Sequence, residues 1–230
     1  MDKLDVLLST WLHTQPLLQV ATIHRWMVIA ADNDLVKGAP LVGFMWYFWF
    51  QEGLEKQNRP RIIIGGFGAL VAAAASRTLA FLFPFRPRPL DVPYLHFDVP
   101  GDAFEIKGGS FPSDHAALAF AMVACIYLIS PRIGILLGIY ALAFIGFPRL
   151  YLGIHWPTDI LGGAILGVLI VFVLNRDRVR NALARPVLNW HDNFRASFYA
   201  GMFFMMFGLM NRFEGFRELL HIAHSSFWRP

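Results

Sequence analysis

The stretch TDILGGAILGVLIVFVL, residues 158–174, decides the fold class of this chain because every residue after Asp159 is apolar or glycine. Residues 62–76 (IIIGGFGALVAAAAS) form a second run without charge. A helix needs about 20 apolar residues to cross a bilayer core, and one small soluble core leaves no room for several such runs. With 56% hydrophobic and 16% charged residues, the chain is predicted to be an integral membrane protein.

Similar runs recur along the chain and predict an all-α fold, a bundle of about six transmembrane helices. The predicted spans are 35–51, 61–84, 111–130, 132–148, 157–175 and 198–211. They form one transmembrane domain, residues 35–211, which a C-terminal tail, 212–230, follows.

The N-terminal segment, residues 1–34, precedes the first predicted span. Apolar side chains at helical spacing predict an amphipathic helix that lies in the membrane interface. These side chains are Leu4, Leu7, Leu8, Trp11 and Leu12. An ordinary helix docked on the rest of the protein explains the same pattern.

The loops between the spans differ in charge. Alternate threading places loops 85–110 and 148–157 on one side and loops 51–61, 131–132 and 175–197 on the other. The second side carries most of the basic residues: Lys56, Arg59, Arg61, Arg132, Arg176, Arg178, Arg180, Arg185 and Arg195. Because cytoplasmic loops are enriched in Lys and Arg, the second side is predicted to be cytoplasmic. The first side then faces outward, which in a bacterial inner membrane is the periplasmic side.

Composition excludes several other classes of site. The single cysteine, Cys125, can form neither a disulfide within the chain nor a cysteine-based metal site. The net charge of +4 is modest, and no basic stretch alternates with aromatic residues as a nucleic-acid surface would require. The predicted partner is the lipid bilayer, and no nucleic-acid partner is expected.

The outward loops and the adjoining helix ends carry an unusual set of polar side chains. They are Arg86, Arg88, Ser113, His115, Arg149, His155 and Asp159. Ionisable groups beside apolar spans are candidates for a functional site. Arginine side chains match phosphate oxygens with paired donors, and two histidines can divide nucleophilic attack and proton delivery. The residue types therefore predict chemistry on a phosphate group.

Two local patterns indicate how these residues are placed. Ser113 and Asp114 precede an apolar run, which indicates a helix start whose free N–H groups attract an anion; taken alone, the pattern is better explained by a simple helix cap. His155 and Asp159 lie four positions apart, so the carboxylate can fix the imidazole tautomer and leave the other nitrogen free to attack. Taken alone, this pair also fits an interfacial histidine without a catalytic role.

In their order, these residues resemble the type 2 phosphatidic acid phosphatase family. The family motifs are Lys, six residues and Arg-Pro; then Pro-Ser-Gly-His; then Ser-Arg, five residues, His, three residues and Asp. This chain has Arg88-Pro89, then Pro112-Ser113-Asp114-His115, then Arg149, His155 and Asp159 at the family intervals. The motifs cover residues 81–159, and the helix layout extends the resemblance over most of the chain.

The resemblance implies a membrane enzyme that hydrolyses a lipid phosphate or diphosphate through a phosphohistidine. His155 would attack phosphorus, Asp159 would orient it, and His115 would protonate the leaving oxygen. The phosphoryl oxygens would be bound by Arg88, Ser113 and Arg149. Neither a cofactor nor a metal ion is implied.

Three positions depart from the family pattern. Phe81 stands where the family has lysine. Arg77 lies one helical turn earlier, but its side chain is expected to lean away from the site, so Arg86 and Lys107 are further candidates for the missing charge. Pro148 replaces the first serine of the third motif. Asp114 replaces glycine, and its carboxylate must point away from the phosphate or pair with an arginine.

The sequence Pro-Ser-Asp-His resembles the form found in some bacterial undecaprenyl-diphosphate phosphatases of this family, which favours a polyprenyl diphosphate as the substrate. Two alternatives remain open. The enzyme could be a phosphotransferase that passes the phosphoryl group to a lipid or sugar acceptor. The chain could also be a catalytically silent protein that binds or transports lipid.

Overall fold

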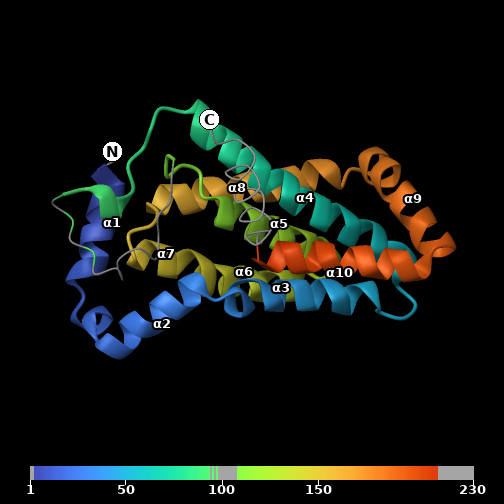
Figure 1. Ribbon diagram of the computed structural model, residues 1–230, viewed down its shortest axis with the longest axis horizontal. Coiled ribbons are helices and arrows are strands. Elements are labelled where there is room, and N and C mark those ends of the chain that lie inside the picture. The colour runs from blue at the N-terminus through green and yellow to red at the C-terminus, as the bar shows by residue number, and fades with distance from the viewer. Residues whose placement is uncertain (1–2, 94, 96, 98–107, 212–230) are drawn as a thin grey trace, which may run out of the picture.

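The computed structural model describes residues 3–93, 95, 97 and 108–211, and its regular elements are helices (Figure 1). They are α1 (Lys3–Thr14), α2 (Ala21–Asp32), α3 (Asp34–Trp49), α4 (Glu55–Leu82), α5 (Asp114–Ile129), α6 (Pro131–Ala141), α7 (Phe147–Tyr151), α8 (Pro157–Leu174), α9 (Asp177–Asn193) and α10 (Arg195–Asn211). Two 3₁₀ turns, η1 (Pro16–Gln19) and η2 (Pro89–Asp91), and a π-helical segment, η4 (Leu142–Gly146), complete the order. The prediction of an all-α fold is confirmed. The predicted tail, 212–230, lies outside the described residues.

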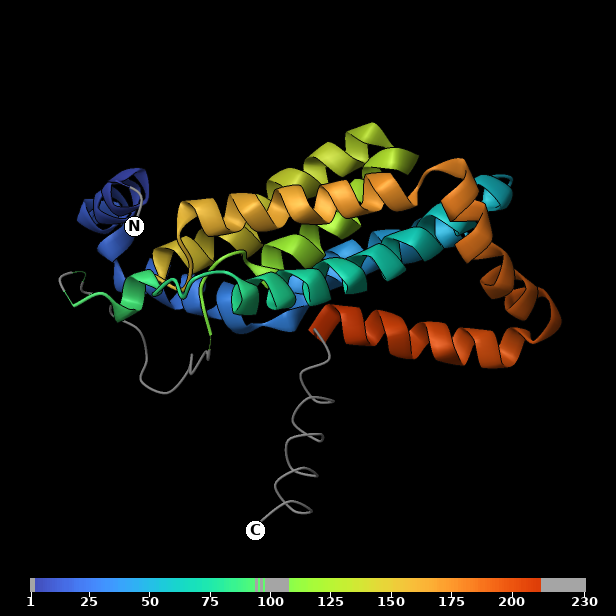
Figure 2. The same ribbon diagram turned by 90° about the horizontal axis from the view of Figure 1, so that it is seen from above.

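The long helices lie side by side along the longest axis of the molecule (Figures 1 and 2). Three helical segments are long and apolar enough to cross a membrane: Glu55–Leu82, Pro131–Tyr151 and Pro157–Leu174. Helix α5 is a shorter apolar helix. Helices α3 and α10 have 16 and 17 residues, so each is about 25 Å long against a bilayer core of about 30 Å. Helices thus occupy all six predicted spans, but only three of them meet the length requirement.

Helices α5 and α8 form the closest pair in the bundle. A Cβ atom on Gly163 would lie 2.2 Å from Ser113 O, and one on Gly167 would lie 2.1 Å from Ala117 O. Only glycine lets the two backbones approach this closely. The contact brings the N-termini of both helices to the same end of the bundle, where Ser113 N–H donates to Asp159 O at 3.0 Å.

The segment 175–197 was predicted to be a loop, and this prediction is wrong because most of the segment forms α9. Arg178, Arg185 and Asp192 are exposed, and charged residues along the helix interrupt any long apolar run. Ala184 and His191 are buried, and α9 packs against α4 and α10. A search for long apolar runs does not detect an amphipathic helix of this kind, because only one of its sides packs against the protein.

Helix α1 lies across the end of the bundle rather than along the long helices (Figures 1 and 2). Its apolar side is open: Leu7 is 65% and Trp11 is 59% exposed. Its opposite side, with Asp5 and Ser9, is buried against the protein, and Leu12, which was predicted to share the apolar side, is buried there as well. The predicted N-terminal amphipathic helix is therefore present and docked through the side that carries Asp5, and its contact with the membrane interface stays a prediction.

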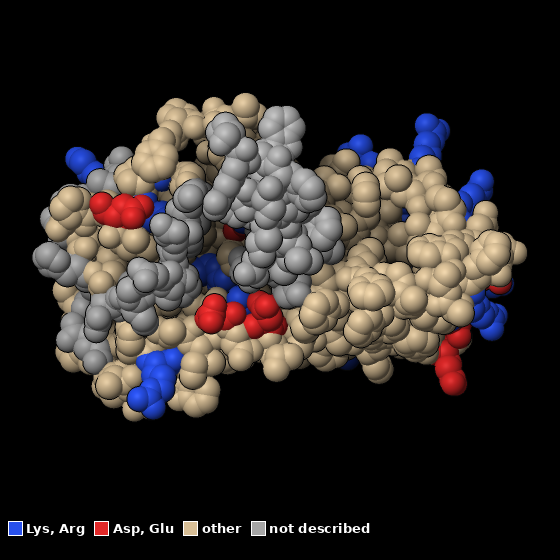
Figure 3. All heavy atoms as spheres, in the orientation of Figure 1, with Lys and Arg blue, Asp and Glu red and all other residues tan. Residues whose placement is uncertain are grey.

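Several Lys and Arg side chains project at the end of the molecule where α9 lies (Figure 3). Other charged side chains lie at the opposite end and near the middle of the visible face, and the surface between this middle group and the α9 end is mostly uncharged.

Candidate active site

The predicted site residues meet at one end of the bundle, where α5 and α8 begin. Ser113 is the N-cap of α5, and its Oγ accepts a hydrogen bond from Ala116 N–H at 3.4 Å. Asp159 is the third residue of α8, and its Oδ2 accepts from Trp156 N–H at 2.8 Å. Both side chains are fully buried. Two helix N-termini, which favour negative charge, therefore point toward the same small volume.

His155 lies between these helix starts and is only 4% exposed. Its Nδ1 is 3.0 Å from Ser110 O and 3.5 Å from Asp159 Oδ2. Because both oxygens only accept, we infer that Nδ1 carries the proton and that Nε2 holds the lone pair. Burial lowers the pKa of His155, although the hydrogen bond to Asp159 raises it. The imidazole is therefore neutral near pH 7, as a nucleophile must be.

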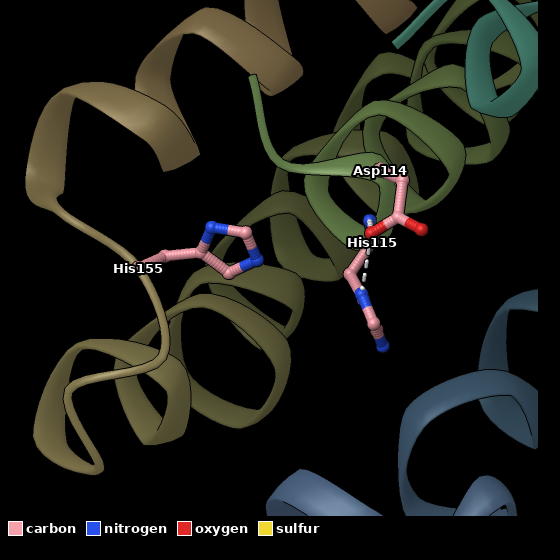
Figure 4. Close-up of side chains that lie close together, drawn as sticks. All are labelled: Asp114, His115 and His155. Carbon is pink, nitrogen blue, oxygen red and sulfur yellow. Dashed lines mark hydrogen bonds and ion pairs between the residues drawn. The ribbon is translucent and has the colours of Figure 1, made fainter. Parts of the chain in front are cut away.

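His115 approaches the same volume from α5 (Figure 4). Its Nδ1 lies 2.8 Å from Asp114 Oδ1. One nitrogen or oxygen atom from each of Asp114, His115 and His155 lies within 4.8 Å of the others. These side-chain types also bind metal ions, and the expectation that the site works without a metal stays a prediction.

Two predicted phosphate ligands, Arg88 and Arg149, are buried. Arg88 Nη1 donates to Ile154 O at 2.7 Å, and Arg149 Nη1 donates to Ile145 O at 2.8 Å. A carbonyl oxygen holds a guanidinium in place but carries no full negative charge. Arg88 Nε is buried and has no hydrogen-bond partner among the described residues, and burial lowers the pKa of Arg88. The Arg88 side chain thus keeps donor capacity for an anion.

Arg86 does not take the place of the family lysine. Its Nη1 lies 2.6 Å from Asp159 Oδ1 and 2.9 Å from Thr158 Oγ1, and its Nη2 pairs with Asp5. The Arg86 guanidinium binds Oδ1 of the Asp159 carboxylate, whereas Oδ2 of the same carboxylate faces His155.

The prediction that Arg77 leans away from the site is wrong. Arg77 Nε lies 3.1 Å from Asp114 Oδ2. The turn of α4 that carries Ser76 and Arg77 lies beside the start of α5, because Ser76 Oγ donates to Pro112 O at 2.9 Å. Phe81, at the position of the family lysine, lies beyond that level and is 82% exposed. Lys107, the other candidate, lies outside the described residues.

Sequence reasoning missed three contributors to the site. Ser110 acts through its backbone carbonyl, which a sequence motif does not encode. Thr158 acts through its hydroxyl and its N–H, and it lies next to the motif residue Asp159. Asp5 is fully buried and reaches the site from α1. A lone acidic residue near the start of a helix is an ordinary feature, so no local signal distinguishes Asp5.

An apolar pocket borders His115 and extends between α3, α5 and α10. Its lining includes Leu41, Leu118, Met122, Ile145, Leu209 and Met210. Lys37 lines the pocket as well. The candidate site therefore adjoins a surface suited to hydrocarbon.

Fold and site together define an integral membrane enzyme with paired histidines, an aspartate and buried arginines at one end of a helical bundle. The profile of the PAP2 superfamily matches residues 61–182, more than half of the chain. The chain belongs to the PAP2 superfamily, which confirms the family expected from the motifs and the prediction of a hydrolase.

Individual relatives agree with this assignment. The chain is 33% identical over 150 residues to the putative undecaprenyl-diphosphatase YbjG of Escherichia coli (strain K12), covering 63% of this chain and 70% of the relative. It is 27% identical over 150 residues to the undecaprenyl-diphosphatase BcrC of Bacillus subtilis (strain 168), covering 65% and 72%. The crystal structure of Aquifex aeolicus LpxE matches with a TM-score of 0.50 at 24% identity, covering 75% of this chain and 94% of that one. The last likeness supports the fold.

Proposed function

We propose that this PAP2-type lipid phosphatase removes the terminal phosphate of a lipid diphosphate, with undecaprenyl diphosphate as the best candidate, through a phosphohistidine on His155. The observation that carries the proposal is the placement of His155. Its Nδ1 faces Ser110 O and Asp159, and a side-chain nitrogen lies within 4.8 Å of corresponding atoms on His115 and Asp114. Neutral imidazole, supporting carboxylate and second histidine are the groups that nucleophilic phosphoryl transfer needs.

In the first step, His155 Nε2 attacks the terminal phosphorus. An N–P bond forms, and the bond from that phosphorus to the bridging oxygen breaks. The leaving oxygen takes a proton from His115, so the lipid departs as a monophosphate. Asp114, with Oδ1 at 2.8 Å from His115 Nδ1, stabilises the protonated form of His115 before transfer.

In the second step, water attacks the phosphorus and gives a proton to His115. An O–P bond forms, the N–P bond breaks, and its electron pair returns to His155 Nε2. Inorganic phosphate leaves and both histidines are restored. Arg88, Arg149 and Ser113 are proposed to hold the phosphoryl oxygens, because transfer of this kind depends chiefly on positioned charge and donors.

The apolar pocket beside His115 supports a lipid substrate. The leaving oxygen lies on the His115 side in the proposed reaction, so the lipid monophosphate that departs with it would lie beside this pocket, whose apolar lining suits contact with a hydrocarbon chain. Both relatives described above are named for undecaprenyl diphosphate, and the Pro-Ser-Asp-His motif favours the same substrate class. We further propose that the site faces the periplasm of a bacterial inner membrane.

The proposal is tested by phosphate release from purified protein in detergent micelles. Undecaprenyl diphosphate, phosphatidic acid and phosphatidylglycerol phosphate are compared as substrates. We expect the diphosphate to give the highest kcat/KM, and His155→Ala to lower kcat by at least about 10³-fold, as for other residues that act as a catalytic unit. His191→Ala removes another buried histidine, one on α9, and serves as the matched control with activity retained.

Rapid acid-free quenching with ³²P-labelled substrate reports the intermediate. Label bound to wild-type protein and absent from His155→Ala supports the phosphohistidine. Full activity in His155→Ala would show that the nucleophile is wrongly assigned. Phosphate transfer that strictly requires an added lipid or sugar acceptor would identify a phosphotransferase instead.

A further inference from the structure

Asp5 is a buried carboxylate that the proposed reaction does not use. It projects from the docked side of α1, and its side chain is 0% exposed. It pairs with Arg86 Nη2, and it accepts hydrogen bonds from Thr158 N–H at 3.1 Å and from Thr158 Oγ1 at 2.7 Å. Burying a charge this completely is costly unless it is paired and hydrogen-bonded. Asp5 is therefore fitted to this end of the bundle by specific contacts.

The contacts to Thr158 cap α8. Trp156, the N-cap residue, has no side-chain acceptor for the free N–H groups of the first turn. Asp5 Oδ1 accepts from Thr158 N–H, and Asp159 Oδ2 accepts from Trp156 N–H. Two carboxylates thus occupy the N-terminus of α8, where unpaired N–H groups and the helix dipole favour negative charge. Asp5 helps to fix the turn that carries Asp159.

Arg86 connects the two carboxylates. Its Nη1 lies 2.6 Å from Asp159 Oδ1, and its Nη2 pairs with Asp5. A guanidinium without a second partner can bind both oxygens of one carboxylate. Asp5 binds the Nη2 end of the Arg86 guanidinium, so Nη1 is left to bind Asp159 through Oδ1. Asp159 Oδ2 therefore stays directed at Trp156 N–H and at His155 Nδ1, 3.5 Å away.

We propose that Asp5 is a positioning residue of the active site. Acting through Arg86 and Thr158, it holds Asp159 in the orientation that supports His155, so the N-terminal helix α1 completes the catalytic site. This inference rests on the proposed roles of His155 and Asp159.

A double-mutant experiment tests the role of Asp5. Asp5→Asn, which keeps the shape of the side chain, is introduced into wild-type protein and into Asp159→Asn. We expect Asp5→Asn alone to lower kcat by about tenfold or more, because a small displacement of Asp159 relative to His155 is costly in rate, with little change in KM. In the Asp159→Asn background the same change should lower kcat by less than about twofold, because the residue through which Asp5 acts is already altered.

Two further variants separate positioning from simple stabilisation of α1. Ser9→Ala alters a buried residue on the same side of α1, one turn away, and should leave kcat unchanged. Asp5→Glu keeps the carboxylate and should retain more of kcat than Asp5→Asn. Thermal unfolding in the same detergent records the loss of stability for each variant.

The outcomes are distinguishable. Equal losses of kcat from Asp5→Asn in the two backgrounds, or equal losses from Asp5→Asn and Asp5→Glu, would overturn the role of Asp5 while leaving the phosphatase function intact. Wild-type protein that releases no phosphate from any of the lipids would instead contradict the proposed function.

Discussion

At the residue scale, Arg77 offsets the negative charge that the departure at Asp114 introduces. The family pattern places a cation at position 81, but that position lies beyond the site and is exposed. Asp114 adds a carboxylate beside the proposed phosphate site, and Arg77 pairs with it at 3.1 Å. The family spacing, counted back from Arg88, does not predict this pairing, because the residues between Leu82 and Arg88 are not helical and the count does not follow the turns of α4.

The pairing predicts a suppressor. Arg77→Met should lower kcat/KM roughly tenfold, since an unbalanced carboxylate would then repel the phosphate. Asp114→Gly, which restores the family residue, should recover part of that loss in the Arg77→Met background. The recovery is only partial because Asp114 also supports protonated His115. Arg185→Met, at an exposed arginine on α9, is the control and should be silent. A double variant no more active than Arg77→Met would contradict the compensation.

At the element scale, the helices that the sequence predicted are those with long apolar runs. Helix α9 was missed because its pattern depends on the partner surface of α4 and α10. Within the site, local spacing predicted that His155 and Asp159 lie close together, and the ordered family motifs predicted that they belong to a catalytic site. The Asp5–Arg86 pair was not, because it joins residues 81 positions apart and such a contact exists only once α1 has docked.

The close packing of α5 and α8 predicts a sensitive glycine. Gly163→Ala would place Cβ 2.2 Å from Ser113 O, so the helices must separate and move Asp159 relative to Ser113. We expect kcat to fall by about 10²-fold, as displacements near 1 Å can cause. Gly43→Ala on α3 meets no atom within 4 Å and should preserve both kcat and the thermal unfolding midpoint. Unchanged kcat in Gly163→Ala would show that the close contact does not position the site.

At the scale of the whole molecule, the site and α9 lie at opposite ends of the bundle (Figure 1). The basic residues that indicate the cytoplasmic side are concentrated in and around α9 and in the first turns of α4. Helices that cross the membrane between these ends must leave the site on the opposite face. The charge distribution and the position of the site therefore make one joint prediction about orientation.

Membrane-impermeant maleimide labelling of intact bacterial cells with a permeable outer membrane tests this orientation. In a Cys125→Ser background, Pro93→Cys adds a thiol to the exposed turn after η2 at the site end, and Glu52→Cys adds one to the exposed loop between α3 and α4. We expect Pro93→Cys to react from outside and Glu52→Cys to react only after the inner membrane is opened. The reverse pattern would place the site in the cytoplasm, where the substrate headgroup would have to be presented from the inner leaflet. Because both thiols are on exposed segments, a difference in their labelling reports the side of the membrane rather than burial within the protein.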